Sequence, residues 1–385
     1  MNKFNHATRI IEGFGTIDCV GTEAKALGAT KVLVVTDSFL STTELFKRIL
    51  SKLEEEQLSY IVYDNVKPNP PTTDCDALVE LARKESVDLL IAYGGGSAMD
   101  EAKAVGALVT NGGKCVDWDY KEFPKKMLPL ITIPTTAGTG SEVTFVAVIT
   151  DEEREYKMSL MDEKNLVPTL AICDPQVTLA LPKSLTAACG IDALTHAIEA
   201  YTVKCSSPMT DAIALYAMEL IAKSIRTAYE DGSDKDAREN MMIGSTMAGM
   251  AFINSNIGAV HAIAETIGAK YGIAHGVANS LFLPYVMEYN IPAEPYRYSV
   301  VAERLGVERT PEMSNEDHAY AGVQFIKKLN RDLQIPCFKD LKGIDPEEFD
   351  LIAEKSAKNP LSIDNARTIE KADYLEILKK AYSNE

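Results

Sequence analysis

The arrangement of hydrophobic and polar residues divides the chain into two parts with different periodicities. From residue 31 to about residue 182, short apolar runs alternate with segments in which apolar residues recur every three or four positions. This alternation predicts strands near residues 31–37, 59–64 and 87–93, with helices near residues 45–53 and 74–84 between them. Because these strands have no polar face, we expect a parallel sheet covered by helices on both sides.

Beyond residue 182 the apolar positions keep a helical spacing almost to the C-terminus, as in residues 211–221. The charged stretch 230–236 fits a solvated loop between two helices. A chain of 385 residues has room for about two domains. We therefore predict an α/β domain over residues 1–182 and an all-α domain over residues 183–385.

Charge and cysteine content narrow the functional classes. The formal net charge is −17, and no cluster of basic residues offsets it, so nucleic acid and an anionic membrane surface are disfavoured partners. The 7 cysteines are odd in number and lack CxxC spacing, which indicates reduced thiols. We find neither a signal peptide nor an apolar run of about 18 residues and expect a cytoplasmic protein.

Two polar loops follow predicted strands. Gly94-Gly95-Gly96 leads into a helix at which Ser97 and Asp100 are placed for reciprocal capping, and residues 134–142 are rich in threonine and glycine. The glycine loop is either a tight structural turn or a phosphate-binding site. The threonine-rich loop is either a capped loop before the next element or a binding site for a diphosphate or ribose. Asp37 ends the first strand; it either caps the next segment or binds ribose hydroxyls, which would favour NAD over NADP.

The helical part contains a candidate metal site. Asp192 and His196 are four residues apart, so both side chains lie on one helix face. His261 and His275 add two imidazoles from later segments. One carboxylate and three imidazoles suit Fe²⁺, Zn²⁺, Mn²⁺ or Co²⁺, and the spacing does not choose among them. A surface ion pair is the structural alternative for Asp192 and His196.

Taken together, these motifs resemble the iron-containing (group III) alcohol dehydrogenase family over essentially the whole chain. The matching segments are residues 36–38, 94–100, 134–144, 190–201, 258–261 and 275–276. The resemblance implies a Rossmann-like, parallel-sheet nucleotide domain, a helical metal-binding domain of the dehydroquinate synthase-like type, and a catalytic cleft between them. It also implies a homodimer or larger homo-oligomer.

The resemblance also assigns residues to roles. The implied metal ligands are Asp192, His196, His261 and His275, with iron the usual metal and zinc the main alternative. The implied contacts to NAD(H) are Asp37, Asn69, Gly95, Gly96, Ser97, Asp100, Thr135, Thr136, Thr139, Lys157 and Leu179. His275 and Glu265 are the candidate catalytic residues.

The chain departs from the family pattern at Glu265, where many relatives have a histidine one helical turn after the ligand that corresponds to His261. Glu265 could relay a proton, approach the metal or pair with a cation. Ser255 and Asn256 stand where relatives commonly have small apolar residues, which predicts a more polar pocket. Residues 365–367 read Asn-Ala-Arg in place of Asn-Pro-Arg, which loosens a turn.

The resulting expectation is a metal- and NAD-dependent oxidoreductase that interconverts a short, polar aldehyde and its primary alcohol, of the 1,3-propanediol, lactaldehyde or sulfoacetaldehyde type. The alternatives are a glycerol or polyol dehydrogenase, a metal-dependent hydrolase or lyase, and a catalytically inactive NAD-binding protein.

Overall fold

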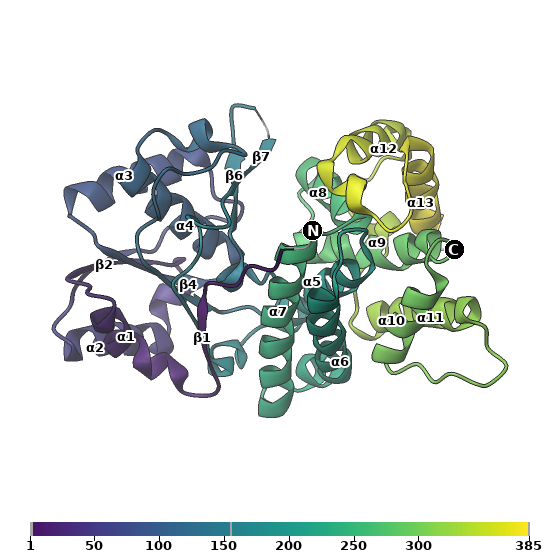
Figure 1. Ribbon diagram of the computed structural model, residues 1–385, viewed down its shortest axis with the longest axis horizontal. Helices are drawn as coiled ribbons and strands as arrows, with labels where there is room; N and C mark the ends of the chain where they lie inside the picture. The colour runs from purple at the N-terminus through teal and green to yellow at the C-terminus, as the bar shows by residue number, and fades with distance from the viewer. Residues whose placement is uncertain (1–2, 155, 384–385) are drawn as a thin grey trace. The chain divides into compact units, whose positions relative to one another are not determined.

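The computed structural model describes residues 3–154 and 156–383, which form two compact units (Figure 1). One unit spans residues 5–179, and the other contains residues 3–4 and 180–383. Each unit has its own core, so each is described by itself. In the described part of the chain, we find no helix that combines the length and apolar character of a membrane span.

The N-terminal unit is built on a six-stranded sheet with strand order β1-β8-β5-β4-β2-β3. Every neighbouring pair in this sheet is parallel. The strands are β1 Arg9–Glu12, β2 Lys31–Val35, β3 Ser59–Tyr63, β4 Leu89–Gly94, β5 Leu130–Pro134 and β8 Leu170–Cys173. β4 and β5 are buried along their whole lengths, as expected for central strands of a sheet covered on both faces.

Among the described residues, four α-helices accompany this sheet. They are α1 Val20–Ala26, α2 Glu44–Glu55, α3 Thr72–Lys84 and α4 Gly96–Asn111. α1 and α2 lie on one side of the sheet, and α3 and α4 lie on the other (Figure 1). An antiparallel hairpin of β6 Val146–Asp151 and β7 Tyr156–Met161 forms a separate small sheet, which the sequence analysis did not anticipate.

The described residues of the C-terminal unit form helices and connecting loops, with no strand among them. Its α-helices are α5 Lys183–Thr202, α6 Pro208–Glu230, α7 Lys235–Ser255, α8 Ala259–Tyr271, α9 His275–Asn290, α10 Pro295–Arg304, α11 Asn315–Asp332, α12 Phe349–Lys358 and α13 Lys371–Ser383. α6 and α7 pack along α5 and are joined by the charged loop expected between two helices. The predicted fold class, a parallel α/β part followed by an all-α part, is confirmed.

Candidate metal centre and nucleotide loops

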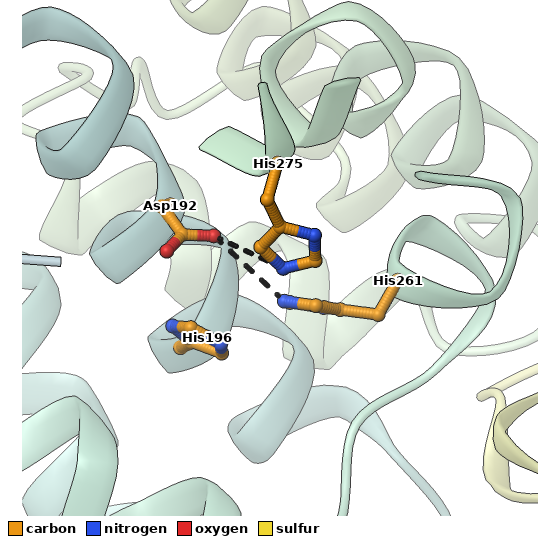
Figure 2. Close-up of side chains that lie close together, drawn as sticks. All are labelled: Asp192, His196, His261 and His275. Atoms are coloured by element: carbon orange, nitrogen blue, oxygen red, sulfur yellow. Dashed lines mark ion pairs between the residues drawn. The ribbon is translucent and has the colours of Figure 1, made fainter. Parts of the chain in front are cut away.

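Four side chains from three helices converge in the C-terminal unit (Figure 2). Asp192 and His196 lie on α5, His261 lies in the first turn of α8, and His275 is the first residue of α9. Each residue offers one ligand atom, and these atoms all lie within 4.8 Å of one another. The structure thus brings together all four residues that the sequence singled out as metal ligands.

Tight helix packing makes this convergence possible. Residues 190–202 of α5 are buried on every side, which places Asp192 and His196 inside the helical core. α9 approaches α5 at Gly276, where a Cβ atom would lie only 2.2 Å from the carbonyl oxygen of Ala188. Only glycine fits at that position, so Gly276 allows His275 to reach Asp192.

The distances within the cluster are short enough for strong electrostatic coupling. Asp192 Oδ1 lies 3.6 Å from His275 Nε2 and 4.0 Å from His261 Nε2. Burial alone would raise the pKa of Asp192, but the three histidines outweigh it and lower that pKa below its ordinary value. The carboxylate is therefore ionised at neutral pH.

Glu199, one turn beyond His196 on α5, fixes the orientation of His261. Its Oε2 lies 2.5 Å from His261 Nδ1, and its Oε1 accepts the backbone N–H of Val260 at 2.8 Å. Burial would lower the pKa of His261, but the Glu199 carboxylate outweighs this and raises it. With Nδ1 held by Glu199, the Nε2 atom of His261 is directed toward Asp192.

This donor set fits a divalent cation. Asp192 Oδ1 lies 3.6–4.0 Å from the two imidazole nitrogens, so a cation about 2.0–2.2 Å from each atom can contact all three. One oxygen and three imidazole nitrogens are the ligand types that iron and zinc accept in proteins. His196, His261 and Asp192 are buried, whereas the side chain of His275 is 38% exposed, so the cluster is open on one side.

Glu265 lies one turn after His261 on α8 but is not part of the four-residue cluster. Its Oε2 accepts a hydrogen bond of 2.7 Å from the side-chain amide of Asn359. Asn359 is itself fixed, because its Oδ1 caps the following 3-10 turn at Leu361 N. The Glu265 carboxylate is close enough to His261 to favour the protonated form of that histidine.

The polar residues at the end of α7 are held by local hydrogen bonds. Ser255 is buried, and its hydroxyl contacts the carbonyl oxygens of Ala251 and Asn256. The side-chain amide of Asn256 donates to Asp364 Oδ2 at 2.6 Å. These contacts use the donor groups that were expected to make a pocket polar. Phe252, one turn earlier, stacks on His196 with ring centroids 4.3 Å apart.

In the N-terminal unit, the two predicted nucleotide loops lie side by side. A Cβ atom at Gly95 would lie 3.5 Å from Thr136 Oγ1, and one at Gly96 would lie 3.0 Å from Thr139 Cγ2. The Ser97 cap was predicted wrongly. α4 begins at Gly96 with Gly95 as its N-cap, and no side chain caps this helix start. A glycine N-cap leaves the first backbone N–H groups accessible to an anion.

The other predicted cofactor residues are held in several local settings. Asp37 Oδ1 accepts the backbone N–H groups of Phe39 and Leu40 at 2.9 Å, so it organises the turn after β2. Lys157 Nζ donates to Asn69 Oδ1 at 2.9 Å, which brings these two residues together. Thr135 directly follows β5, and Leu179 follows the last 3-10 turn of the unit.

Asp100 is bound within the protein. Its Oδ1 accepts the Ser141 hydroxyl at 2.7 Å, and its Oδ2 accepts the backbone N–H of Val148 at 3.1 Å. The same network contains Lys103, whose Nζ donates to Ser141 Oγ at 2.7 Å and to Thr144 Oγ1 at 3.1 Å. Asp100 therefore joins α4 to the threonine-rich loop.

Comparison with protein families gives matches over both units. The model described as "Iron-containing alcohol dehydrogenase" matches residues 7–175. The model described as "Fe-containing alcohol dehydrogenase family, C-terminal" matches residues 186–382. The two matches together cover most of the chain.

Individual relatives align over nearly their full lengths. The chain is 38% identical to the NAD-dependent methanol dehydrogenase of Bacillus methanolicus over 99% of this chain and 100% of the relative. It is 37% identical to the choline dehydrogenase of Bacillus subtilis over 99% of this chain and 95% of the relative. The crystal structure of a 1,3-propanediol oxidoreductase superposes with a TM-score of 0.96 at 35% identity and covers 99% of this chain and 100% of that one.

Proposed function

Because the chain belongs to the iron-containing alcohol dehydrogenase family, a family of oxidoreductases, we propose that it interconverts a short, polar aldehyde and its primary alcohol by hydride transfer with NAD(H). The observation that carries this proposal is the convergence of Asp192, His196, His261 and His275 on one centre. A carboxylate and three imidazoles can hold the divalent metal that the family name implies.

Each half of the chain has its own task in this proposal. The four residues would hold the metal, Fe²⁺ by family and Zn²⁺ as the main alternative, which when bound would supply a Lewis acid for a substrate carbonyl. Burial of Asp192, His196 and His261 excludes water from most of the centre, and the exposed part of His275 leaves one side open to a small molecule. Glu199 keeps the His261 ring in its ligating orientation.

For the cofactor, we propose that the backbone N–H groups at Gly95 and Gly96 bind the diphosphate, with hydroxyls of the threonine-rich loop beside them. Ser97, Asp100, Thr135, Thr136, Thr139 and Leu179 belong to this cofactor surface in the proposal, as do Asn69 and Lys157. Asp37 would repel a 2′-phosphate, which favours NAD over NADP.

A polar substrate is proposed on the basis of Glu265 rather than of Ser255 and Asn256. Glu265 and the Asn359 amide place a carboxylate and a hydrogen-bonding amide one helical turn from His261. A hydroxyl at the far end of a short aldehyde could pair with them, and Glu265 could also relay a proton. Family membership alone does not choose the substrate, because a methanol dehydrogenase and a choline dehydrogenase are similar to this chain at 38% and 37% identity.

The test is NADH oxidation by purified protein of known metal content with propanal, glycolaldehyde, lactaldehyde, 3-hydroxypropanal and sulfoacetaldehyde. We expect turnover with a higher kcat/KM for a hydroxyaldehyde than for propanal, because its hydroxyl can pair with Glu265, whereas the sulfonate of sulfoacetaldehyde would be repelled by this carboxylate. Equal values for all five would refute the polar preference and leave a general alcohol dehydrogenase. Absence of turnover with metal bound would refute the dehydrogenase proposal itself.

His261→Ala tests the metal ligands directly. We expect loss of bound metal and of NADH oxidation, while NADH binding measured by fluorescence remains, because the proposed cofactor residues belong to the other unit. His318→Ala is the matched control, since His318 is equally buried and contacts Ser299 and Val307 outside the cluster. It should keep its metal. An active His261→Ala enzyme with normal metal content would contradict the ligand assignment.

A further inference from the structure

A fifth residue, Asn279, reaches into the histidine cluster from α9. It lies one turn after His275 and is fully buried. Its amide nitrogen Nδ2 lies 2.6 Å from Asp192 Oδ1, 3.1 Å from His261 Nε2 and 3.2 Å from His275 Nε2. One amide group is thus within hydrogen-bond distance of three of the four ligand atoms.

The chemistry of this contact is unusual because the donors and acceptors do not match in number. An amide NH₂ group has two hydrogens, and here its nitrogen faces three ligand atoms, of which the histidine Nε2 atoms accept when the ring proton is on Nδ1. Asn279 is 0% exposed, and in the described part of the chain its carbonyl oxygen Oδ1 is buried without a partner while its amide nitrogen contacts the ligand atoms. An unpaired buried oxygen is costly, so the position of the nitrogen calls for an explanation.

A histidine nitrogen that accepts a hydrogen bond cannot use the same lone pair to bind a metal. The charge-assisted bond from Asn279 to Asp192 is different, because a carboxylate oxygen has lone pairs both for an amide and for a cation. The amide therefore competes with a metal for His261 and His275 but need not compete for Asp192.

We propose that Asn279 is a positioning residue that competes with the metal: in the apoprotein its amide holds Asp192, His261 and His275 together, and metal binding displaces it from the two histidines. This inference rests on the metal site of the proposed function. Asn279 then limits metal affinity, because each binding event must break hydrogen bonds to buried nitrogens. It also keeps the ligands close together in the apoprotein, where its amide donates to the buried carboxylate.

The test measures metal binding to apoprotein, with Asn279→Leu as the main variant because leucine has a similar size and no donor. Binding of Co²⁺ is followed by competition with a chromophoric chelator. We expect the dissociation constant for Co²⁺ to fall about tenfold, since the competing hydrogen bonds are lost from the apoprotein only. The thermal midpoint of the apoprotein should fall, and saturating Co²⁺ should raise it more than in the unmodified protein.

Asn290→Leu is the matched control. Asn290 lies on the same helix and is 2% exposed, but it donates to Tyr298 and Asn365 rather than to a ligand. Asn279→Ser is a second variant that removes the amide and stays polar. If a variant folds only with metal, release of Co²⁺ from loaded protein to EDTA replaces the equilibrium measurement, and we expect slower release than from Asn290→Leu.

The outcomes separate this inference from the metal site itself. Tighter binding or slower release in both Asn279 variants, with the Asn290→Leu protein unchanged, supports competition by the amide. An unchanged or weaker Co²⁺ affinity overturns it and leaves Asn279 as a residue that only orients Asp192. If the unmodified apoprotein binds no Co²⁺, the proposed metal site fails and this inference fails with it.

Discussion

Each unit contains a polar cluster around a carboxylate. The groups that stabilise the carboxylate differ between the two clusters. In the N-terminal unit, Asp100 accepts hydrogen bonds from Ser141 and Val148, and its Oδ1 lies 3.7 Å from the fully buried Lys103 Nζ. Burial lowers the pKa of Lys103 to about 8, so at neutral pH the lysine remains charged. This cluster contains its own cation.

The histidine cluster of the C-terminal unit differs in that its ionised carboxylate faces imidazole nitrogens. Asp192 is 3% exposed, and the groups nearest to its Oδ1 are the Asn279 amide and two histidines. An imidazole nitrogen with a free lone pair can bind a cation, whereas the ammonium of Lys103 cannot. The cluster around Asp100 therefore pairs its carboxylate with a charge of the chain, whereas the cluster around Asp192 turns its ligand-type atoms toward one another.

Lys103→Met tests the structural side of this comparison and should have the largest effect on stability. Removing the fully buried ammonium leaves Asp100, whose side chain is 16% exposed, without its cation and takes a donor from Ser141, Thr144 and the carbonyl oxygen of Val146. Breaking a buried pair in this way costs about 3–5 kcal/mol. We expect a loss of that size in the free energy of unfolding, measured in urea, and weaker NADH binding because the threonine-rich loop loses its support.

Lys84→Met is the control for this variant. Lys84 is an exposed lysine near the end of α3, and its removal should change the free energy of unfolding by less than about 0.5 kcal/mol. Equal stabilities of the two variants would show that the Lys103 network contributes nothing specific.

Glu199→Gln tests the histidine cluster with a smaller perturbation. The glutamine side chain can accept a hydrogen bond from either His261 Nδ1 or Val260 N, but not from both as Glu199 does. Partners of this kind typically change metal affinity by about 10–100-fold. We expect the Zn²⁺ dissociation constant to rise by that factor in chelator competition. Glu288→Gln, at a partly exposed ion pair with Lys327, should leave it unchanged.

The sequence predicted those features that depend on local spacing. Runs of β-branched residues marked the central strands, and β2, β3 and β4 begin within two residues of the predicted strand starts. Asp192 and His196 followed from their four-residue spacing on one helix face. The capping rule failed at Ser97. The spacing of Ser97 and Asp100 fits the capping-box pattern, but the helix already begins at Gly96, because a glycine turn can start a helix without a side-chain cap.

The features that the sequence did not predict depend on packing between helices. Glu199 lies three residues after His196 and Asn279 four after His275, so a search of the same helix faces could have named both. Their roles could not be predicted that way, because His261 and Asp192 reach them from other helices. Similarly, Gly276 became informative only when α9 was seen to approach Ala188.

Glu101 adds a third kind of buried carboxylate to the comparison and gives a smaller expected effect on stability than Lys103. It follows Asp100 on α4 and is fully buried, and burial, with a further contribution from the charge of Asp74, raises its pKa to about 7. Protonation thus keeps Glu101 neutral in the core, whereas Asp100 is paired with the charged Lys103. Because the folded pKa lies above the ordinary value of 4.5, the stabilisation is complete below about pH 4.5 and disappears as the pH rises through 7.

Glu101→Gln replaces this carboxyl with a side chain that stays neutral at every pH. Relative to the unmodified protein, we expect the variant to gain about 2–3 kcal/mol in the free energy of unfolding between pH 5 and pH 8, because only glutamate must ionise in the core as the pH rises. Urea unfolding at both pH values measures this, with the exposed Glu80→Gln on α3 as the control. Parallel pH profiles for Glu101→Gln and the unmodified protein would mean that the Glu101 carboxylate is stabilised in the core by its neighbours and that no proton is needed there.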